Sequence, residues 1–158
     1  MRSPAEVTGT GPPGAAPLRP GSSAGYQVNR LARLYEAALR QRIARYGVVP
    51  GQFPALLALY ERDGQTQREL CEIASVDQST MAKTLARMER DRLVTSAPDP
   101  EDARRVRYYL TGTARGLEAK LSEAGHEVLA AAAAGIPADQ IEVFNQVLAA
   151  MAGNLGGH

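Results

Sequence analysis

Hydrophobic residues recur at helical spacing along most of this chain. Between residues 26 and 46 they fall on one stripe, which predicts an amphipathic helix: Leu31, Leu34, Tyr35, Ala38, Leu39 and Ile43. Gly47 is expected to end this helix, because glycine readily adopts the left-handed conformation of a C-cap. A second stripe at positions i, i+3, i+4 and i+7 predicts another helix, which Asp63 and Gly64 end: Phe53, Leu56, Leu57 and Tyr60.

Two further helices are predicted after Gly64, with a tight connection between them. Thr66 and Glu69 form a capping box, in which the hydroxyl and the carboxylate each satisfy a free backbone N–H. This helix is expected to bury Leu70, Ile73 and Ala74. The connection at residues 75–77 is short, as two crossing helices require, and the charge of Asp77 favours the next helix start. On that next helix Met81, Leu85 and Met88 form the inward stripe, and Ser79, Lys83, Arg87 and Arg90 form the outward one.

Two short strands are predicted at residues 94–97 and 106–110. Pro98, Asp99 and Pro100 exclude a helix between them. In the second strand two sets of residues alternate, as expected for a strand that packs on one face only. The sets are Val106, Tyr108 and Leu110, and Arg105, Arg107 and Tyr109. The order of elements is helix, turn, helix and hairpin. It predicts a mainly α fold with a small β-wing, a winged helix-turn-helix at about residues 50–111.

Two helices are expected after the hairpin. Thr111 is a suitable N-cap for the first, whose stripe is Leu117, Leu121, Val128 and Ala132. Gly135 breaks this helix, and Pro137 at a first helical position with Asp139 in the first turn begins the last one. The last helix carries a stripe of larger residues: Ile141, Phe144, Leu148, Met151 and Leu155.

The N-terminal segment differs from the rest of the chain. Residues 1–25 contain five of the ten Pro and show no apolar periodicity, so we expect a disordered arm. With only Arg2 and Arg19 as basic residues, a plain tail is favoured over a DNA-contacting arm. Residues 26–158 are expected to form a single domain, because 158 residues with 44% hydrophobic and 22% charged positions are typical of one globular unit.

Charge is unevenly distributed although the net value is only +1. Residues 30–45 contain five Arg and one Glu, and residues 104–107 contain three Arg and no acid. After residue 116 the only Lys or Arg is Lys120, and the same stretch contains five acids: Glu118, Glu123, Glu127, Asp139 and Glu142. The C-terminal part is therefore not expected to touch phosphate.

The second helix of the pair and the hairpin are the candidate DNA-binding elements. A helix fits the major groove, and residues near its N-terminus reach base edges. Gln78 can form a bidentate pair with adenine, Ser79 and Thr80 can bond bases or phosphates, and Lys83 and Arg87 can reach guanine or the backbone. In the hairpin, Arg104 at the tip can enter the narrow minor groove, held by Asp102 through a charge-assisted hydrogen bond. Arg105 and Arg107 are expected to meet phosphates, unless the strand alternation turns one of them aside.

These residues resemble a known family. The stretch DPEDARRVRYYLT at 99–111 is similar to the wing signature of the MarR family of bacterial transcription regulators, with its Asp-x-Arg core and final Leu-Thr. The preceding VDQSTMAKTLARMERDRLV is similar to the recognition helix of that family and its exit into the wing. By position, Asp102 and Arg104 match the family's wing pair, and Ser79 and Thr80 match its Ser-Thr pair. Arg92 departs from the pattern, since it stands where a Gly usually precedes the wing.

The resemblance also implies partners. It implies a homodimer joined through the terminal helices, about residues 26–46 and 112–155, on a pseudopalindromic double-stranded operator. Repression follows from the frequency of repressors among such regulators, and the residues themselves do not distinguish a repressor from an activator. A small aromatic or phenolic effector is often bound between the two parts of such proteins. Tyr35, Phe53 and Tyr60 could line that site, although a plain core role is favoured for them.

Other kinds of function find less support in the sequence. An enzyme is disfavoured, because no Gly-rich phosphate loop, nucleophile elbow or ligand cluster is present, and no cofactor is expected. Glu123, His126 and Glu127 share a helix face, but a single His does not predict a metal site. Cys71 is alone, which excludes an internal disulfide; a buried small hydrophobe is favoured over a redox switch. No membrane span or export signal is evident, so the cytoplasm is the expected location. A winged-helix module that binds protein instead of DNA remains the main alternative.

Overall fold

The computed structural model describes residues 17, 19–21 and 23–156. The predicted arm, residues 1–25, lies largely outside the described residues. The chain divides into two compact units, one ending at Arg33 and one beginning at Leu34. The first unit contributes the beginning of helix α1 (Ala24–Ile43), where Tyr26, Val28 and Leu31 are exposed. The second unit holds all the elements that follow.

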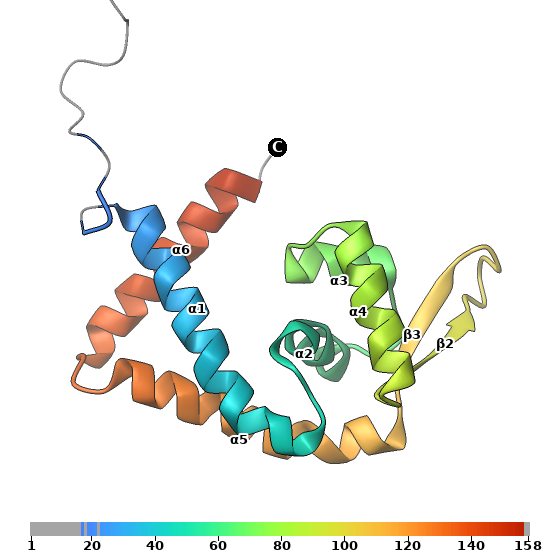
Figure 1. The fold of residues 1–158 in the computed structure, drawn as a ribbon. Coiled ribbons are helices and arrows are strands. Elements are labelled where there is room, and N and C mark those ends of the chain that lie inside the picture. Colours follow the sequence, from blue (N-terminus) through green and yellow to red (C-terminus); the bar gives the residue numbers. More distant parts are fainter. Residues whose placement is uncertain (1–16, 18, 22, 157–158) are drawn as a thin grey trace, which may run out of the picture. The chain divides into compact units, whose positions relative to one another are not determined.

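The second unit is a winged helix-turn-helix, which confirms the predicted fold class (Figure 1). A 3-10 turn at Ala44–Tyr46 ends at Gly47, and a second one at Pro50–Gln52 leads into α2. The remaining helices are α2 (Phe53–Glu61), α3 (Gln67–Ala74), α4 (Gln78–Arg90), α5 (Gly112–Ala133) and α6 (Ala138–Gly156). The strands are β1 (Gln65–Thr66), β2 (Val94–Pro98) and β3 (Val106–Leu110).

Local side-chain caps at Thr66, Asp77 and Thr111 set the starts of α3, α4 and α5, as predicted from the sequence. Thr66 accepts the Glu69 N–H at 3.3 Å, and the Glu69 carboxylate accepts the Thr66 N–H at 2.8 Å. That backbone bond, together with the Arg62 side chain, lowers the pKa of Glu69 to about 2. Thr111 accepts the Ala114 N–H at 3.1 Å, and its hydroxyl donates to the Arg92 carbonyl at 2.7 Å. One hydroxyl therefore ties the exit from α4 to the start of α5.

Two left-handed turns position the helices of the module. Ser75 has a φ of 53° between α3 and α4, and Arg92 has a φ of 58° between α4 and β2. Glycine adopts this conformation without steric cost, whereas a residue with a Cβ does so rarely. Arg92 stands where the resemblance predicts a Gly, and it adopts the left-handed conformation although it has a Cβ.

The sheet has three antiparallel strands in the order β1–β3–β2. Val94 pairs with Leu110 and Pro98 with Val106, which makes the predicted hairpin. The two-residue strand β1 was not predicted; it pairs Gln65 with Tyr108. Gly64 precedes it with a φ of 73°, and a Cβ there would lie 2.8 Å from a ring carbon of Tyr109.

One hydrophobic core joins α2, α3, α4 and α5 with the strands. Its most buried large side chains include Leu56, Leu59, Leu70, Leu85, Met88 and Leu121. Two predicted core positions are wrong: Ile73 is 54% exposed and Leu57 is 43% exposed. Both lie at the edge of a stripe on a short helix, where the facing elements already cover the neighbouring residues.

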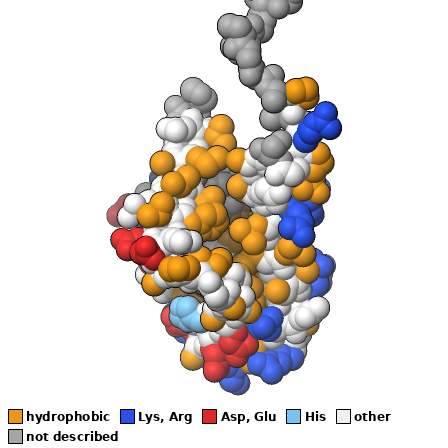
Figure 2. All heavy atoms as spheres, turned by 90° about the vertical axis from the view of Figure 1, so that its left-hand side faces the viewer, with side chains coloured by type: hydrophobic (Ala, Val, Ile, Leu, Met, Phe, Trp, Pro, Cys, Tyr) orange, Lys and Arg blue, Asp and Glu red, His pale blue; other side chains and the backbone are white. Residues whose placement is uncertain are grey.

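Helix α6 buries none of its residues within this chain. Figure 2 shows hydrophobic side chains gathered on the side of the molecule that carries α5 and α6. The exposed large hydrophobic residues of these two helices and their link are Leu129, Ile136, Val143, Phe144, Val147, Met151 and Leu155. Of the predicted stripe of α6, Ile141 and Leu148 are half-buried, whereas Phe144, Met151 and Leu155 are exposed.

Candidate nucleic-acid interface

Helix α4 is anchored by its inward stripe and exposes the opposite face. Met81, Leu85 and Met88 are at most 2% exposed. A helix with this stripe fixed in the core must turn its other positions outward. The exposed residues of α4 include Gln78, Ser79, Thr80, Lys83 and Arg87, the proposed DNA-contacting set.

Asp77 caps α4 and orders its first turn. Its carboxylate accepts the Thr80 N–H at 2.8 Å and the Thr80 hydroxyl at 2.9 Å. These two bonds lower the pKa of Asp77. The Thr80 side chain is thus turned toward its own helix start.

A polar network holds the other end of α4. Gln52 is 1% exposed; its amide donates to Asp91 at 2.8 Å and its oxygen accepts the Val49 N–H at 3.1 Å. Arg87 lies 3.5 Å from the same Asp91 carboxylate. The end of the candidate recognition helix is therefore fastened to the segment that precedes α2.

The wing tip presents Arg104 in an ordered form. Its side chain is 91% exposed, yet Nε donates to Asp102 at 3.0 Å and Nη2 at 3.3 Å. The Asp102 carboxylate also accepts the Arg104 N–H at 3.1 Å, and these contacts with Arg104 lower its pKa. Arg105 lies 3.5 Å from the same carboxylate. One acid therefore orients two arginines at the tip.

The Arg107 side chain contacts other parts of the chain, whereas the sequence predicts that it faces phosphate. Its Nε is 2.8 Å from Asp99, and its Nη1 donates to the Gly64 carbonyl at 2.8 Å. The side chain of Asp99 is 2% exposed and that of Arg107 25% exposed. Arg107 therefore links the wing to the turn before β1. Asp99, for which the sequence predicts only an exclusion of helix, anchors this link.

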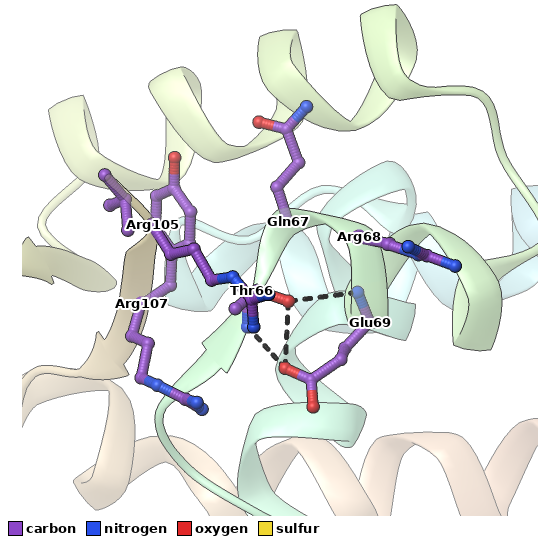
Figure 3. Close-up of a pocket in the computed structure, with 8 residues that line it drawn as sticks. Thr66, Gln67, Arg68, Glu69, Arg105 and Arg107 are labelled. Atoms are coloured by element: carbon purple, nitrogen blue, oxygen red, sulfur yellow. Dashed lines mark hydrogen bonds between the residues drawn. The ribbon is translucent and has the colours of Figure 1, made fainter. Parts of the chain in front are cut away.

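An open pocket of about 560 Å³ lies between the start of α3 and strand β3. It is lined by Thr66, Gln67, Arg68, Glu69, Arg105, Val106, Arg107 and Tyr108. Figure 3 shows the capping box of Thr66 and Glu69 at its centre, with Gln67 and Arg107 pointing in opposite directions. The helix start that faces this pocket is already occupied by the chain's own carboxylate.

The three aromatic residues considered for an effector belong to the core or pack against it. Phe53 is 7% exposed and lies against Gly125 of α5. The Tyr60 hydroxyl donates to the Ala114 carbonyl at 2.7 Å, and burial raises its pKa to about 12. Tyr35 is half-buried against the same core. These contacts agree with the favoured core role.

Cys71 and His126, the candidates for a redox and a metal site, have surroundings that favour neither role. Cys71 is buried, and burial raises the pKa of its thiol, which disfavours the reactive thiolate. Among the described residues no group of three or more His, Cys, Asp and Glu side chains could hold a metal ion, and this includes the neighbourhood of His126. None of the helices described is both long and apolar enough to cross a membrane.

Comparison with known proteins finds similarity to one family over the central part of the chain. A sequence model of the MarR family matches residues 46–105, from the 3-10 turn that follows α1 to the wing tip. The HTH-type transcriptional regulator TtmR of Methylorubrum extorquens is 30% identical over 103 residues, which are 65% of this chain and 53% of that protein. The HTH-type transcriptional repressor NicR of Pseudomonas putida is 29% identical over 93 residues, 59% of each chain. The chain thus aligns with little more than half the length of these relatives.

The fold agrees over a longer range. The crystal structure of the PcaV transcriptional regulator from Streptomyces coelicolor, in complex with its natural ligand, is 25% identical in sequence. It superposes with a TM-score of 0.77 over 87% of this chain and 97% of that one. The sequence match and the shared fold agree: the chain is similar to the MarR family of transcriptional regulators over residues 46–105 and has the fold of a solved transcriptional regulator.

Proposed function

We propose that the chain is a regulator that binds duplex DNA through α4 in the major groove and the wing tip in the minor groove, and that it is not an enzyme. The held arginine of the wing carries this proposal. Arg104 is 91% exposed but fixed by Asp102. A guanidinium held in solvent at a hairpin tip suits the narrow minor groove, where the negative potential is strongest.

The assembly proposed is a homodimer. Helix α6 exposes Val143, Phe144, Val147 and Met151 along one face. Contiguous exposed apolar surface of this kind marks an interaction site. A two-fold dimer through these helices would present two copies of α4 to half-sites about 34–36 Å apart, and a pseudopalindromic operator follows from that symmetry.

Repression relieved by a small effector completes the proposal. NicR is a named repressor, and PcaV was solved with its natural ligand. An effector that binds beside Tyr35, Phe53 and Tyr60 would have to open the core that they now fill. Its binding energy would shift the protein toward a conformation in which the two α4 helices no longer match the operator.

The variant Arg104→Ala tests the wing. We expect operator affinity to fall by about 1–3 kcal/mol, because the minor-groove contact is lost. DNA from beside the chain's own gene, titrated across salt concentrations, supplies the measurement. Arg40→Ala, which removes an exposed arginine paired with Glu36 on α1, is the matched control and should bind like the wild type.

Two outcomes would count against this mechanism. Equal affinity of Arg104→Ala and wild type would remove the wing from DNA binding. Weak wild-type binding that is the same on random DNA and insensitive to salt would favour the alternative of a protein-interaction module.

A further inference from the structure

A pair of glutamines joins the first residues of the two helices in the helix-turn-helix. Gln67 begins α3 and Gln78 begins α4. The Nε2 atom of Gln67 donates to the backbone carbonyl of Gln78 at 3.1 Å and to the side-chain Oε1 of Gln78 at 2.8 Å. The sequence alone does not predict this pair, because the two glutamines lie 11 positions apart.

The backbone carbonyl fixes the orientation of both amides. A glutamine amide can ordinarily be turned over, because its nitrogen and oxygen have similar size. A backbone carbonyl only accepts, so Gln67 must direct its NH2 group toward Gln78. The Gln78 side chain must then direct its oxygen toward Gln67, because two NH2 groups would face each other in the opposite orientation.

Both partners stand on helix starts that are themselves held. The Thr66–Glu69 capping box fixes the backbone just before and after Gln67. Asp77 fixes the first turn of α4 around Gln78 through Thr80. Figure 3 shows the Gln67 side chain directed away from the capping box and from Arg107. The capped starts of α3 and α4 therefore fix the geometry of the hydrogen bond between the two glutamines.

We propose that Gln67 determines specificity by positioning Gln78 as an adenine reader, an inference that rests on the proposed DNA-binding function. The major-groove edge of adenine presents one acceptor, N7, and one donor, the N6 amino group. The held Gln78 offers its NH2 group to the first, and the second lone pair of its oxygen to the other. Guanine presents two acceptors there and does not match. Gln67 itself touches no base. It fixes the Gln78 side chain before DNA binds, so binding costs less side-chain entropy.

Selection of binding sites from a randomised duplex pool tests the proposal with the full-length chain. The set comprises wild type, Gln67→Ala, Gln78→Ala and the double variant, with Arg68→Ala as the control from the neighbouring position. Arg68 is 83% exposed on the same helix, so its removal should at most lower affinity on all sequences alike. Urea unfolding of each variant shows whether the fold is kept.

We expect wild type to prefer adenine at one base pair in each half-site, and Gln78→Ala to lose that preference. The loss should amount to about 5- to 150-fold in discrimination, the range for one bidentate contact. Gln67→Ala should weaken the preference at the same pair and leave the other positions unchanged. The double variant should match Gln78→Ala, because Gln67 acts only through Gln78.

The contrary results are distinct. Three results would overturn the positioning role while leaving DNA binding intact. Gln67→Ala could keep the full adenine preference, or it could change the preference at another base pair. The double variant could also discriminate adenine less well than Gln78→Ala does. Failure of the wild type to enrich any sequence would overturn the proposed function, and this inference with it.

Discussion

Replacing Leu85 by alanine is expected to lower the free energy of unfolding by about 2–5 kcal/mol. Leu85 is 1% exposed and lies on the inward face of α4 between Met81 and Met88. The variant buries less apolar surface and leaves a cavity that the neighbouring core only partly closes. Urea unfolding at one fixed protein concentration measures the loss, since an assembling protein gains stability with concentration.

The outward face of the same helix supplies the control. Lys83→Ala removes an exposed side chain two positions away, so its unfolding free energy should stay within about 0.5 kcal/mol of wild type. Its DNA affinity should fall, and the salt dependence should lose about one counterion. Equal stability of Leu85→Ala and Lys83→Ala would mean that α4 is not anchored by its inward stripe.

Replacing Arg107 by alanine is expected to cost about 3 kcal/mol of stability, the lower end for breaking a buried ion pair. The variant leaves the Asp99 carboxylate, 2% exposed, without its cation, and the Gly64 carbonyl without its donor. The lower end applies because the Arg107 side chain is itself 25% exposed. Thermal or urea unfolding measures the change.

Arg105→Ala is the matched comparison from the same hairpin. Its side chain is 67% exposed and faces only the Asp102 carboxylate across 3.5 Å, so its removal should change stability by less than about 0.5 kcal/mol. If Arg107→Ala were no more costly than Arg105→Ala, the contact with Asp99 would not hold the wing. Arg107→Lys should restore stability only in part, since one ammonium cannot span both acceptors as the guanidinium does.

Features that depend on neighbouring residues were predictable from the sequence. The caps at Thr66, Asp77 and Thr111 each act within three or four positions, so a short window of sequence contains the whole interaction. The inward stripe of α4 was equally clear, because 13 residues display three full turns of the pattern. Such local signals placed the helix-turn-helix and the hairpin correctly.

Features that depend on distant pairing were missed. Strand β1 has two residues, too few for any period, and exists because Gln65 meets Tyr108 across 43 positions. The role of Arg107 follows from the burial of Asp99, which alternation along one strand does not reveal. Ile73 was misplaced because an eight-residue helix leaves the edge of its stripe undefined.

The same distinction applies to the candidate site. The charged and hydroxyl residues of α4 and the wing tip can be named as candidates from their type and position alone. Gln67 was not, because its partner Gln78 lies 11 positions away, across a turn. Only the geometry of that turn, with Ser75 in the left-handed region, brings the two helix starts within hydrogen-bond distance.

The exposed wing tip also makes the chain open to limited proteolysis. Exposed loop tips are preferred sites of nicking, and trypsin cleaves after arginine. Arg104 and Arg105 have side chains 91% and 67% exposed outside any helix or strand, so brief digestion should cut there before it cuts the arginines within helices. A duplex seated on the wing would cover these bonds. The rate of cleavage at these two bonds would then report how much of the protein carries DNA, without a label on either molecule.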